Sequence, residues 1–131
     1  MNKQTLEVRN PATSEKITEL RVATAEDVTR AVSQARRAQA LWQEKSYAER
    51  AEVLYRFRDL LIDHQDEIGD TVTAETGKPL AEVYVNELFY VCDSAGFWAK
   101  NAAKYLKPER LRPHLLKTKR VISRYDPVGV V

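Results

Sequence analysis

The sequence predicts a single, mainly helical domain with a β-hairpin at its N-terminal end and an extended strand near its C-terminal end. The length of 131 residues allows one domain, because domains typically contain about 100–150 residues. Apolar residues make up 44% of the chain, which supplies a hydrophobic core and excludes global disorder. Across the middle of the chain, apolar side chains recur at steps of three and four, the spacing of one face of an α-helix.

Composition and charge exclude several classes of protein. The 21 basic and 19 acidic side chains leave a net charge of +2, which argues against a polyanion-binding protein defined by bulk charge. A single cysteine cannot form an intramolecular disulfide, and no Cys/His spacing is typical of a zinc site. We therefore expect a protein of a reducing compartment without a structural metal.

The sequence also lacks the patterns of membrane and nucleotide-binding segments. The N-terminal residues are polar, without the apolar run of a signal peptide, and no stretch of about 18 apolar residues occurs. The four glycines are not spaced as a phosphate-binding loop or a dinucleotide fingerprint. We expect a cytoplasmic protein with no membrane partner and no cofactor-binding residues of its own.

Residues 5–23 are expected to form the N-terminal hairpin. Leu6 and Val8 alternate with polar residues, as in a half-buried strand, until Asn10–Pro11 interrupts the pattern. Proline fixes φ and donates no backbone hydrogen bond, so the first strand ends there. A second run rich in branched residues, 17–22, favours a returning strand after a short turn.

A first helix is predicted over residues 25–44. Thr24 stands three residues before Asp27, the spacing of a capping box in which each side chain bonds the other residue's backbone N–H. Apolar side chains then recur along one face from Val28 to Trp42. This face is expected to pack against another part of the protein.

A second helix is predicted over residues 47–76, because Ser46 and Glu49 repeat the capping signal. Its apolar face extends from Val53 to Ile68. Since the connection between the two helices is short, we expect them to form a helical hairpin.

A third helix is predicted over residues 79–106. Gly77 can adopt the left-handed conformation that ends the preceding helix, and Pro79 suits the first turn of a new one. The ring of Pro108 disfavours helical geometry in the residue before it, so the helix ends there. Beyond it, residues 115–125 carry charge on both faces, which favours an extended strand, either at a solvated edge or awaiting a pairing partner.

Cys92 and two histidines are the candidates for nucleophilic or acid–base chemistry, and none is predicted to be catalytic. The helical neighbours of Cys92 are apolar, which raises the pKa of a thiol and favours a core cysteine. His64 lies among acidic residues and could form an acid–base pair, but the polar run favours a solvated helix end. His114 has no partner nearby in the sequence.

Charge is unevenly distributed along the chain. Acidic residues dominate 59–93, whereas nine basic residues accompany the single acidic Glu109 within 100–124. Mutual compensation or a solvated surface explains this pattern most simply. The alternative is a nucleic-acid binder that uses the basic segment, with Tyr105 and Tyr125 as stacking groups, but no recognised motif surrounds them. We do not expect nucleic acid as a partner.

Five short segments carry a resemblance to a known family. They lie in that family's order and spacing: Asn10–Thr13, Ala23–Val28, Glu49–Ala51, Glu75–Leu80 and Tyr125–Val131. The most specific of them is Glu75-Thr76-Gly77-Lys78-Pro79-Leu80. On these segments the chain resembles the opening of the aldehyde dehydrogenase superfamily, and its residues 105–112 are similar to the succinate-semialdehyde group.

The resemblance implies an α/β fold of which this chain is a truncated, mainly helical N-terminal portion, with residues 128–131 starting a strand of the dinucleotide domain. It also implies an enzyme that uses NAD or NADP to oxidise an aldehyde to a carboxylic acid. In the family's order, the nucleophilic cysteine, the general-base glutamate and the Gly-rich turn come after the position that matches Val131. We therefore expect this chain alone to be inactive. Its implied partners are the remaining part of the enzyme, other subunits, or further copies through self-association.

The resemblance also implies two groups of site residues. Val8, Arg9 and Glu75 match positions where family members hold a monovalent cation through two backbone carbonyls and a carboxylate. The alternative is that Glu75 only favours the local helix turn. Asn86 and Tyr90 match positions at the mouth of the substrate tunnel, and the alternative for them is helix packing.

A rival hypothesis requires no enzymatic activity. The same helices would then serve as a stand-alone helical interaction module that has kept the family's opening segment.

Overall fold

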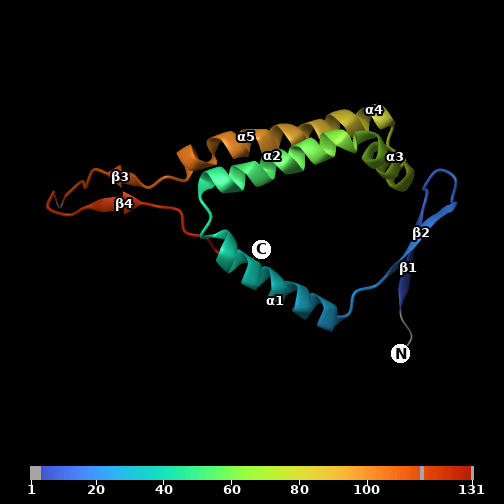
Figure 1. Cartoon of the computed structure of the whole chain (residues 1–131), viewed down its shortest axis with the longest axis horizontal. Helices are drawn as coiled ribbons and strands as arrows, with labels where there is room; N and C mark the ends of the chain where they lie inside the picture. Colours follow the sequence, from blue (N-terminus) through green and yellow to red (C-terminus); the bar gives the residue numbers. More distant parts are fainter. Residues whose placement is uncertain (1–3, 116, 131) are drawn as a thin grey trace.

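The structure is a computed structural model that describes residues 4–115 and 117–130. It consists of packed helices flanked by two β-hairpins. Helix α2 (Tyr47–Asp63) runs alongside α5 (Tyr90–Tyr105), and the hairpins lie at opposite ends of the molecule (Figure 1). Helix α1 (Ala25–Trp42) lies apart from the paired helices (Figure 1). The mainly helical architecture with an N-terminal hairpin is confirmed.

The N-terminal hairpin pairs β1 (Thr5–Arg9) with β2 (Lys16–Arg21) in antiparallel register. Asn10 shapes its turn, because the side-chain oxygen accepts hydrogen bonds from the backbone N–H of Ala12 at 2.8 Å and of Thr13 at 3.2 Å. Asparagine is favoured in turns for this ability to bond its own backbone a few residues on. The hairpin is therefore closed by Asn10 as well as by the proline that follows it.

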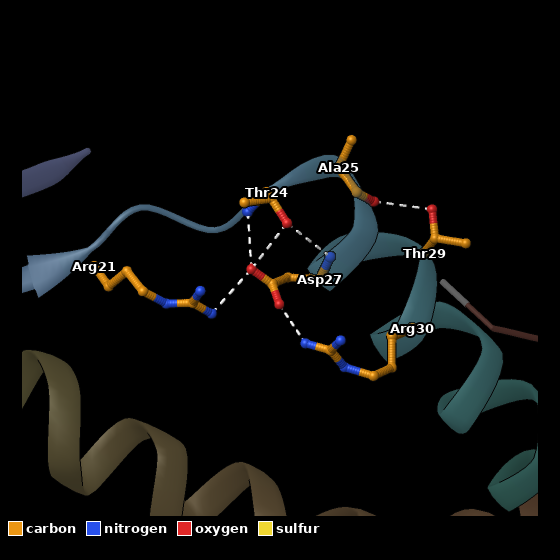
Figure 2. Close-up of polar contacts among 6 residues, drawn as sticks. All are labelled: Arg21, Thr24, Ala25, Asp27, Thr29 and Arg30. Carbon is orange, nitrogen blue, oxygen red and sulfur yellow. Dashed lines mark hydrogen bonds and ion pairs between the residues drawn. The ribbon is translucent and has the colours of Figure 1, made fainter. Parts of the chain in front are cut away.

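Both predicted capping boxes are present. Thr24 Oγ1 accepts a hydrogen bond from the backbone N–H of Asp27 at 3.2 Å, and Asp27 Oδ2 accepts one from the backbone N–H of Thr24 at 3.0 Å (Figure 2). Ser46 and Glu49 exchange the equivalent bonds at 3.2 and 2.8 Å. Helices α1 and α2 begin where these signals predict.

The predicted helical hairpin between the first two helices is wrong. Helix α2 packs against α5, while α1 lies apart from both (Figure 1). Small residues on α5 permit the close approach: Ala95 is buried, and a Cβ on Gly96 would lie 3.7 Å from Nη1 of Arg58 in α2. An apolar helical face does not specify its partner, so the pattern of α2 did not distinguish α1 from α5.

The helix predicted over residues 47–76 is two helices in the structure. Helix α2 stops before His64, which adopts φ −106° and ψ 17°, and α3 (Gln65–Thr76) follows it. Neither proline nor glycine marks this break, so the local sequence contains no stop signal. After the break, Gly69 of α3 packs closely against the segment that follows α3, where an added Cβ would lie only 2.8 Å from Cδ1 of Leu80.

The helix predicted over residues 79–106 is not uniform. Gly77 ends α3 in the left-handed region with φ 74°, as predicted. The following segment comprises α4 (Leu80–Glu82), the π-helix η1 (Val83–Phe89) and α5. Such π-helical turns are rare and widen the helix locally, and the apolar spacing gave no sign of one. Val83 in η1 is fully buried.

The C-terminal extended segment differs most from the prediction. Strands β3 (Glu109–Leu111) and β4 (Val121–Ser123) pair antiparallel as a second hairpin. Of the predicted strand over residues 115–125, only β4 is in a strand, and Leu116 lies outside the described residues. The partner of β4 was missed because three residues are too few to show an alternating pattern.

The predicted start of a further strand at residues 128–131 is also absent from the described part of the chain. Residues 128–130 belong to no strand, and Val131 lies outside the described residues. A strand forms by hydrogen bonding to a neighbour, and no strand pairs with this segment among the residues that the structure describes.

Candidate functional site

Asn86 and Tyr90, the predicted substrate-tunnel residues, lie on the π-helix and at the first residue of α5. Both side chains are exposed, and Tyr90 and its neighbour Phe89 keep 69% and 68% of their surface accessible. Neither side chain is buried against the rest of the described chain, so helix packing within it does not explain why Asn86 and Tyr90 stand at these positions. Asn86 lies within the π-helix and Tyr90 directly follows it, and such helices are often found at functional sites.

Two polar contacts fasten the π-helix to its surroundings. Tyr84 Oη donates a hydrogen bond to Oδ1 of Asp66 in α3 at 2.9 Å, and this bond to a carboxylate raises the pKa of Tyr84 above its ordinary value. Lys78, in the linker before α4, forms an ion pair with Glu87. The two contacts are made by residues on either side of Asn86 in the sequence.

The predicted cation ligands lie in two segments that the fold brings into one region. Val8 and Arg9 end β1, and Glu75 lies in the last turn of α3. Pro11, in the turn after β1, has its Cγ 3.2 Å from the position of a Cβ on Gly77. The hairpin turn therefore lies against the C-terminal end of α3.

The side chain of Arg9 is engaged within its own hairpin. Its Nε donates to Oε2 of Glu7 at 3.0 Å, and its Nη1 donates to the backbone carbonyl of Ser14 at 3.0 Å. The first of these bonds lowers the pKa of Glu7. Among the residues that the structure describes, no three Cys, His, Asp or Glu side chains are grouped as metal ligands. A cation here would depend on backbone carbonyls, as the resemblance implies.

The structure does not bring Cys92 and His64 together. Cys92 is half-buried between α5 and α2, with its Sγ 4.0 Å from the backbone carbonyl of Arg58. His64 is exposed at the α2–α3 junction, and its Nδ1 lies 3.3 Å from Oε2 of Glu67. His114 is exposed and lies outside the helices and strands. The arrangement agrees with a structural role for Cys92.

A hollow lined in part by Arg50 was not predicted. It forms where the end of α1, the start of α2, the end of α5 and residues 125–129 meet. Its lining residues are Gln39, Trp42, Gln43, Tyr47, Arg50, Leu106, Tyr125, Asp126, Pro127, Val128 and Gly129. These residues come from three segments separated along the chain, 39–50, 106 and 125–129, so no local pattern could have indicated the hollow.

Comparison with known proteins identifies the family. The model described as the aldehyde dehydrogenase family matches residues 1–131. The chain belongs to the aldehyde dehydrogenase family. It is 33% identical over 128 residues to the mitochondrial succinate-semialdehyde dehydrogenase of Arabidopsis thaliana, covering 98% of this chain and 24% of that protein.

Solved structures of aldehyde dehydrogenases share the fold. A succinate-semialdehyde dehydrogenase from Burkholderia pseudomallei has a TM-score of 0.80 and 34% identity, covering 91% of this chain and 24% of that one. An NADP dependent enzyme of E. coli has the same TM-score, 29% identity and the same coverage. The chain thus spans about a quarter of the length of its relatives and corresponds to their N-terminal portion. In residues 4–115 and 117–130, no helix combines the length and apolar character needed to cross a bilayer.

Proposed function

We propose that this chain is the N-terminal scaffold segment of an NAD(P)-dependent aldehyde dehydrogenase that oxidises an aldehyde to a carboxylic acid. One observation carries the proposal: the whole chain matches one enzyme family, and it covers about a quarter of the length of its relatives. On this proposal the 131-residue chain alone is catalytically incomplete, because the family's nucleophilic cysteine matches a later position and Cys92 packs between helices.

The aldehyde would pass Asn86 and Tyr90 at the mouth of the substrate tunnel. The exposure of both side chains and the polar contacts that fix the π-helix support this assignment. NAD or NADP would accept the hydride, bound by the later part of the enzyme. One similar solved enzyme is described as NADP dependent, which supports a dinucleotide of this class.

A monovalent cation would bind between the backbone carbonyls of Val8 and Arg9 and the carboxylate of Glu75. The close approach of Pro11 to Gly77 supports this site, since it places the two ligand segments side by side. Hard oxygen ligands suit such a cation. Its role would be to fasten the hairpin to α3.

The partner of the chain would be the remaining part of the enzyme, in the cytoplasm. Among the described residues, Val83 and Ala95 are the only buried apolar side chains. Helices α1, α2 and α5 and the π-helix η1 all expose large apolar residues. Exposed apolar surface of this extent is typical of an interaction face.

A chimeric enzyme tests the proposal. This chain would replace the matching N-terminal segment of the Burkholderia pseudomallei enzyme, and aldehyde-dependent reduction of NAD and of NADP would be measured. We expect an active chimera and, by calorimetric titration, no binding of either dinucleotide to the isolated chain. Saturable binding by the isolated chain, or a folded chimera without activity, would contradict the scaffold proposal.

Variants of the chimera test the site residues. Asn86→Ala and Tyr90→Ala should raise KM for the aldehyde more than they lower kcat, because the proposed contacts act at the tunnel mouth. Tyr105→Ala, at the other end of α5, serves as the matched control. Equal effects of Tyr90→Ala and Tyr105→Ala would favour helix packing over a tunnel role.

A further inference from the structure

Tyr84 connects the π-helix to α3. Its ring lies against Gly69, since a Cβ on that glycine would come within 3.2 Å of Cε1 of Tyr84. Its hydroxyl donates a hydrogen bond at 2.9 Å to Oδ1 of Asp66, which lies about one turn before Gly69 on the same helix. Because Gly69 has no side chain, the tyrosine ring approaches α3 closely enough for its hydroxyl to reach the carboxylate.

The bond from Tyr84 is the stronger of two polar contacts that the π-helix makes. Tyr84 is half-buried, and its acceptor is a carboxylate in the first turn of α3, where a negative charge is favoured. Hydrogen bonds to an ionised acceptor are stronger than bonds between neutral groups. The ion pair of Lys78 with Glu87 joins side chains that keep 44% and 45% of their surface accessible, and exposed pairs contribute little.

The direction of the Asn86 side chain depends on the form of this helix. Asn86 lies two residues after Tyr84 within η1, and its side chain is exposed. A π-helix closes hydrogen bonds between residues i and i+5 and an α-helix between i and i+4, so the same side chains point in different directions in the two forms. Because a π-helix is rarely the preferred form, contacts outside the segment must favour it here. The bond from Tyr84 to Asp66 is such a contact.

We propose that Tyr84 is a positioning residue, whose bond to Asp66 holds the π-helix in the form that directs Asn86 toward the aldehyde at the tunnel mouth. This inference rests on the proposed function, which assigns Asn86 to that mouth. Tyr84 itself faces α3 and is not proposed to touch the aldehyde. Loss of its hydroxyl therefore weakens binding of the aldehyde more than it slows hydride transfer to NAD or NADP.

Tyr84→Phe in the chimeric enzyme removes the hydroxyl and keeps the ring against Gly69. We expect KM for the aldehyde to rise by about threefold to tenfold, with kcat within about twofold of the parent chimera. Asp66→Ala removes the acceptor and should give the same rise, whereas Asp66→Asn keeps an acceptor oxygen and should leave KM near the parent value. Tyr55→Phe removes the hydroxyl of another half-buried tyrosine, on α2, and is the matched control that should leave KM unchanged.

A double variant tests whether Tyr84 acts through Asn86. Asn86→Ala already removes the contact that Tyr84 positions, so adding Tyr84→Phe should raise KM no further. Two effects that multiply in the double variant would show that the tyrosine only supports the fold, and would overturn the proposal. An unchanged KM in Tyr84→Phe, or an equal rise in Tyr55→Phe, would overturn it as well.

The outcomes separate this inference from the proposed function. If Asn86→Ala leaves KM unchanged, or if the folded parent chimera is inactive, the proposed function fails and this inference fails with it. If Asn86→Ala raises KM and Tyr84→Phe does not, the positioning role alone fails. If circular dichroism shows that Tyr84→Phe prevents folding of the chimera, the two Asp66 variants decide the question, because both keep the whole tyrosine side chain.

Discussion

Arg21 in β2 donates a hydrogen bond from Nη2 to Oδ2 of Asp27 in α1 at 2.9 Å, and this ion pair fastens the first hairpin to the helix that follows it (Figure 2). The same carboxylate accepts hydrogen bonds from the backbone N–H and the hydroxyl of Thr24, each at 3.0 Å. Arg30 pairs with its other oxygen. One side chain thus caps α1 and connects it to β2.

Acid should weaken the fold through Asp27. The hydrogen bonds from Thr24 hold the pKa of this carboxyl well below its ordinary value of 3.8, so its ionised form stabilises the folded state. That stabilisation is complete above the ordinary value and is lost as the pH falls towards the lower pKa of the folded chain. We expect Asp27→Asn to lower the unfolding midpoint at neutral pH, with a smaller difference from the unaltered chain in strong acid.

Urea unfolding at neutral pH and at about pH 2 measures this effect. Asp63→Asn is the matched control, because Asp63 is exposed at the end of α2. A destabilisation by Asp27→Asn that stays the same at both pH values would show that the carboxylate acts without its charge.

Loss of the cap on α2 should lower stability. Ser46→Ala removes the hydroxyl that accepts from the backbone N–H of Glu49 at 3.2 Å, and we expect a loss of about 1 kcal/mol in the free energy of unfolding. Ser33→Ala is the control, since the Ser33 hydroxyl bonds the Thr29 carbonyl inside α1 rather than at a helix end. Denaturant titration of both variants measures the difference, and equal losses would contradict a specific role of the cap.

Two helical glycines should respond differently to the same substitution. In Gly69→Ala the new Cβ would lie 2.8 Å from Cδ1 of Leu80 in α4 and 3.2 Å from Cε1 of Tyr84 in η1, so both side chains must move. In Gly96→Ala the nearest atom is Nη1 of Arg58 at 3.7 Å, which is ordinary contact. Because both variants gain the same helix propensity, the clash alone separates them, and we expect Gly69→Ala to be less stable than Gly96→Ala by about 1 kcal/mol.

Thermal or urea unfolding of the two variants gives this comparison. Equal stabilities would show that the side chains of Leu80 and Tyr84 move aside without cost.

The isolated chain should self-associate. Leu41, Phe89 and Val128 expose 69%, 68% and 91% of their surfaces, and among the described residues only Val83 and Ala95 are buried apolar side chains. Apolar surface of this kind favours association or loosened packing. Size-exclusion chromatography with light scattering should detect species larger than a monomer, and a dye for apolar surface should bind. A monodisperse monomer with a cooperative melt and no dye binding would favour the interaction-module hypothesis instead.

Local signals in the sequence determined where several helices begin and end. Thr24 with Asp27, and Ser46 with Glu49, place the starts of α1 and α2, because each box satisfies backbone donors that the helix itself leaves unpaired. Gly77 fixes the end of α3, since its φ of 74° suits a residue without a side chain. The family was also identified from sequence, through short segments in a fixed order.

Tertiary structure alone decided the pairing of elements. The division at His64, the π-helix at 83–89 and the pairing of α2 with α5 have no local signal, because each depends on which apolar surfaces meet. The hollow lined by Arg50 is the clearest case, since its walls come from three segments separated along the chain. The sequence set the ends of the helices through bonds between near neighbours, whereas packing between distant residues set their partners and the shape of the candidate sites.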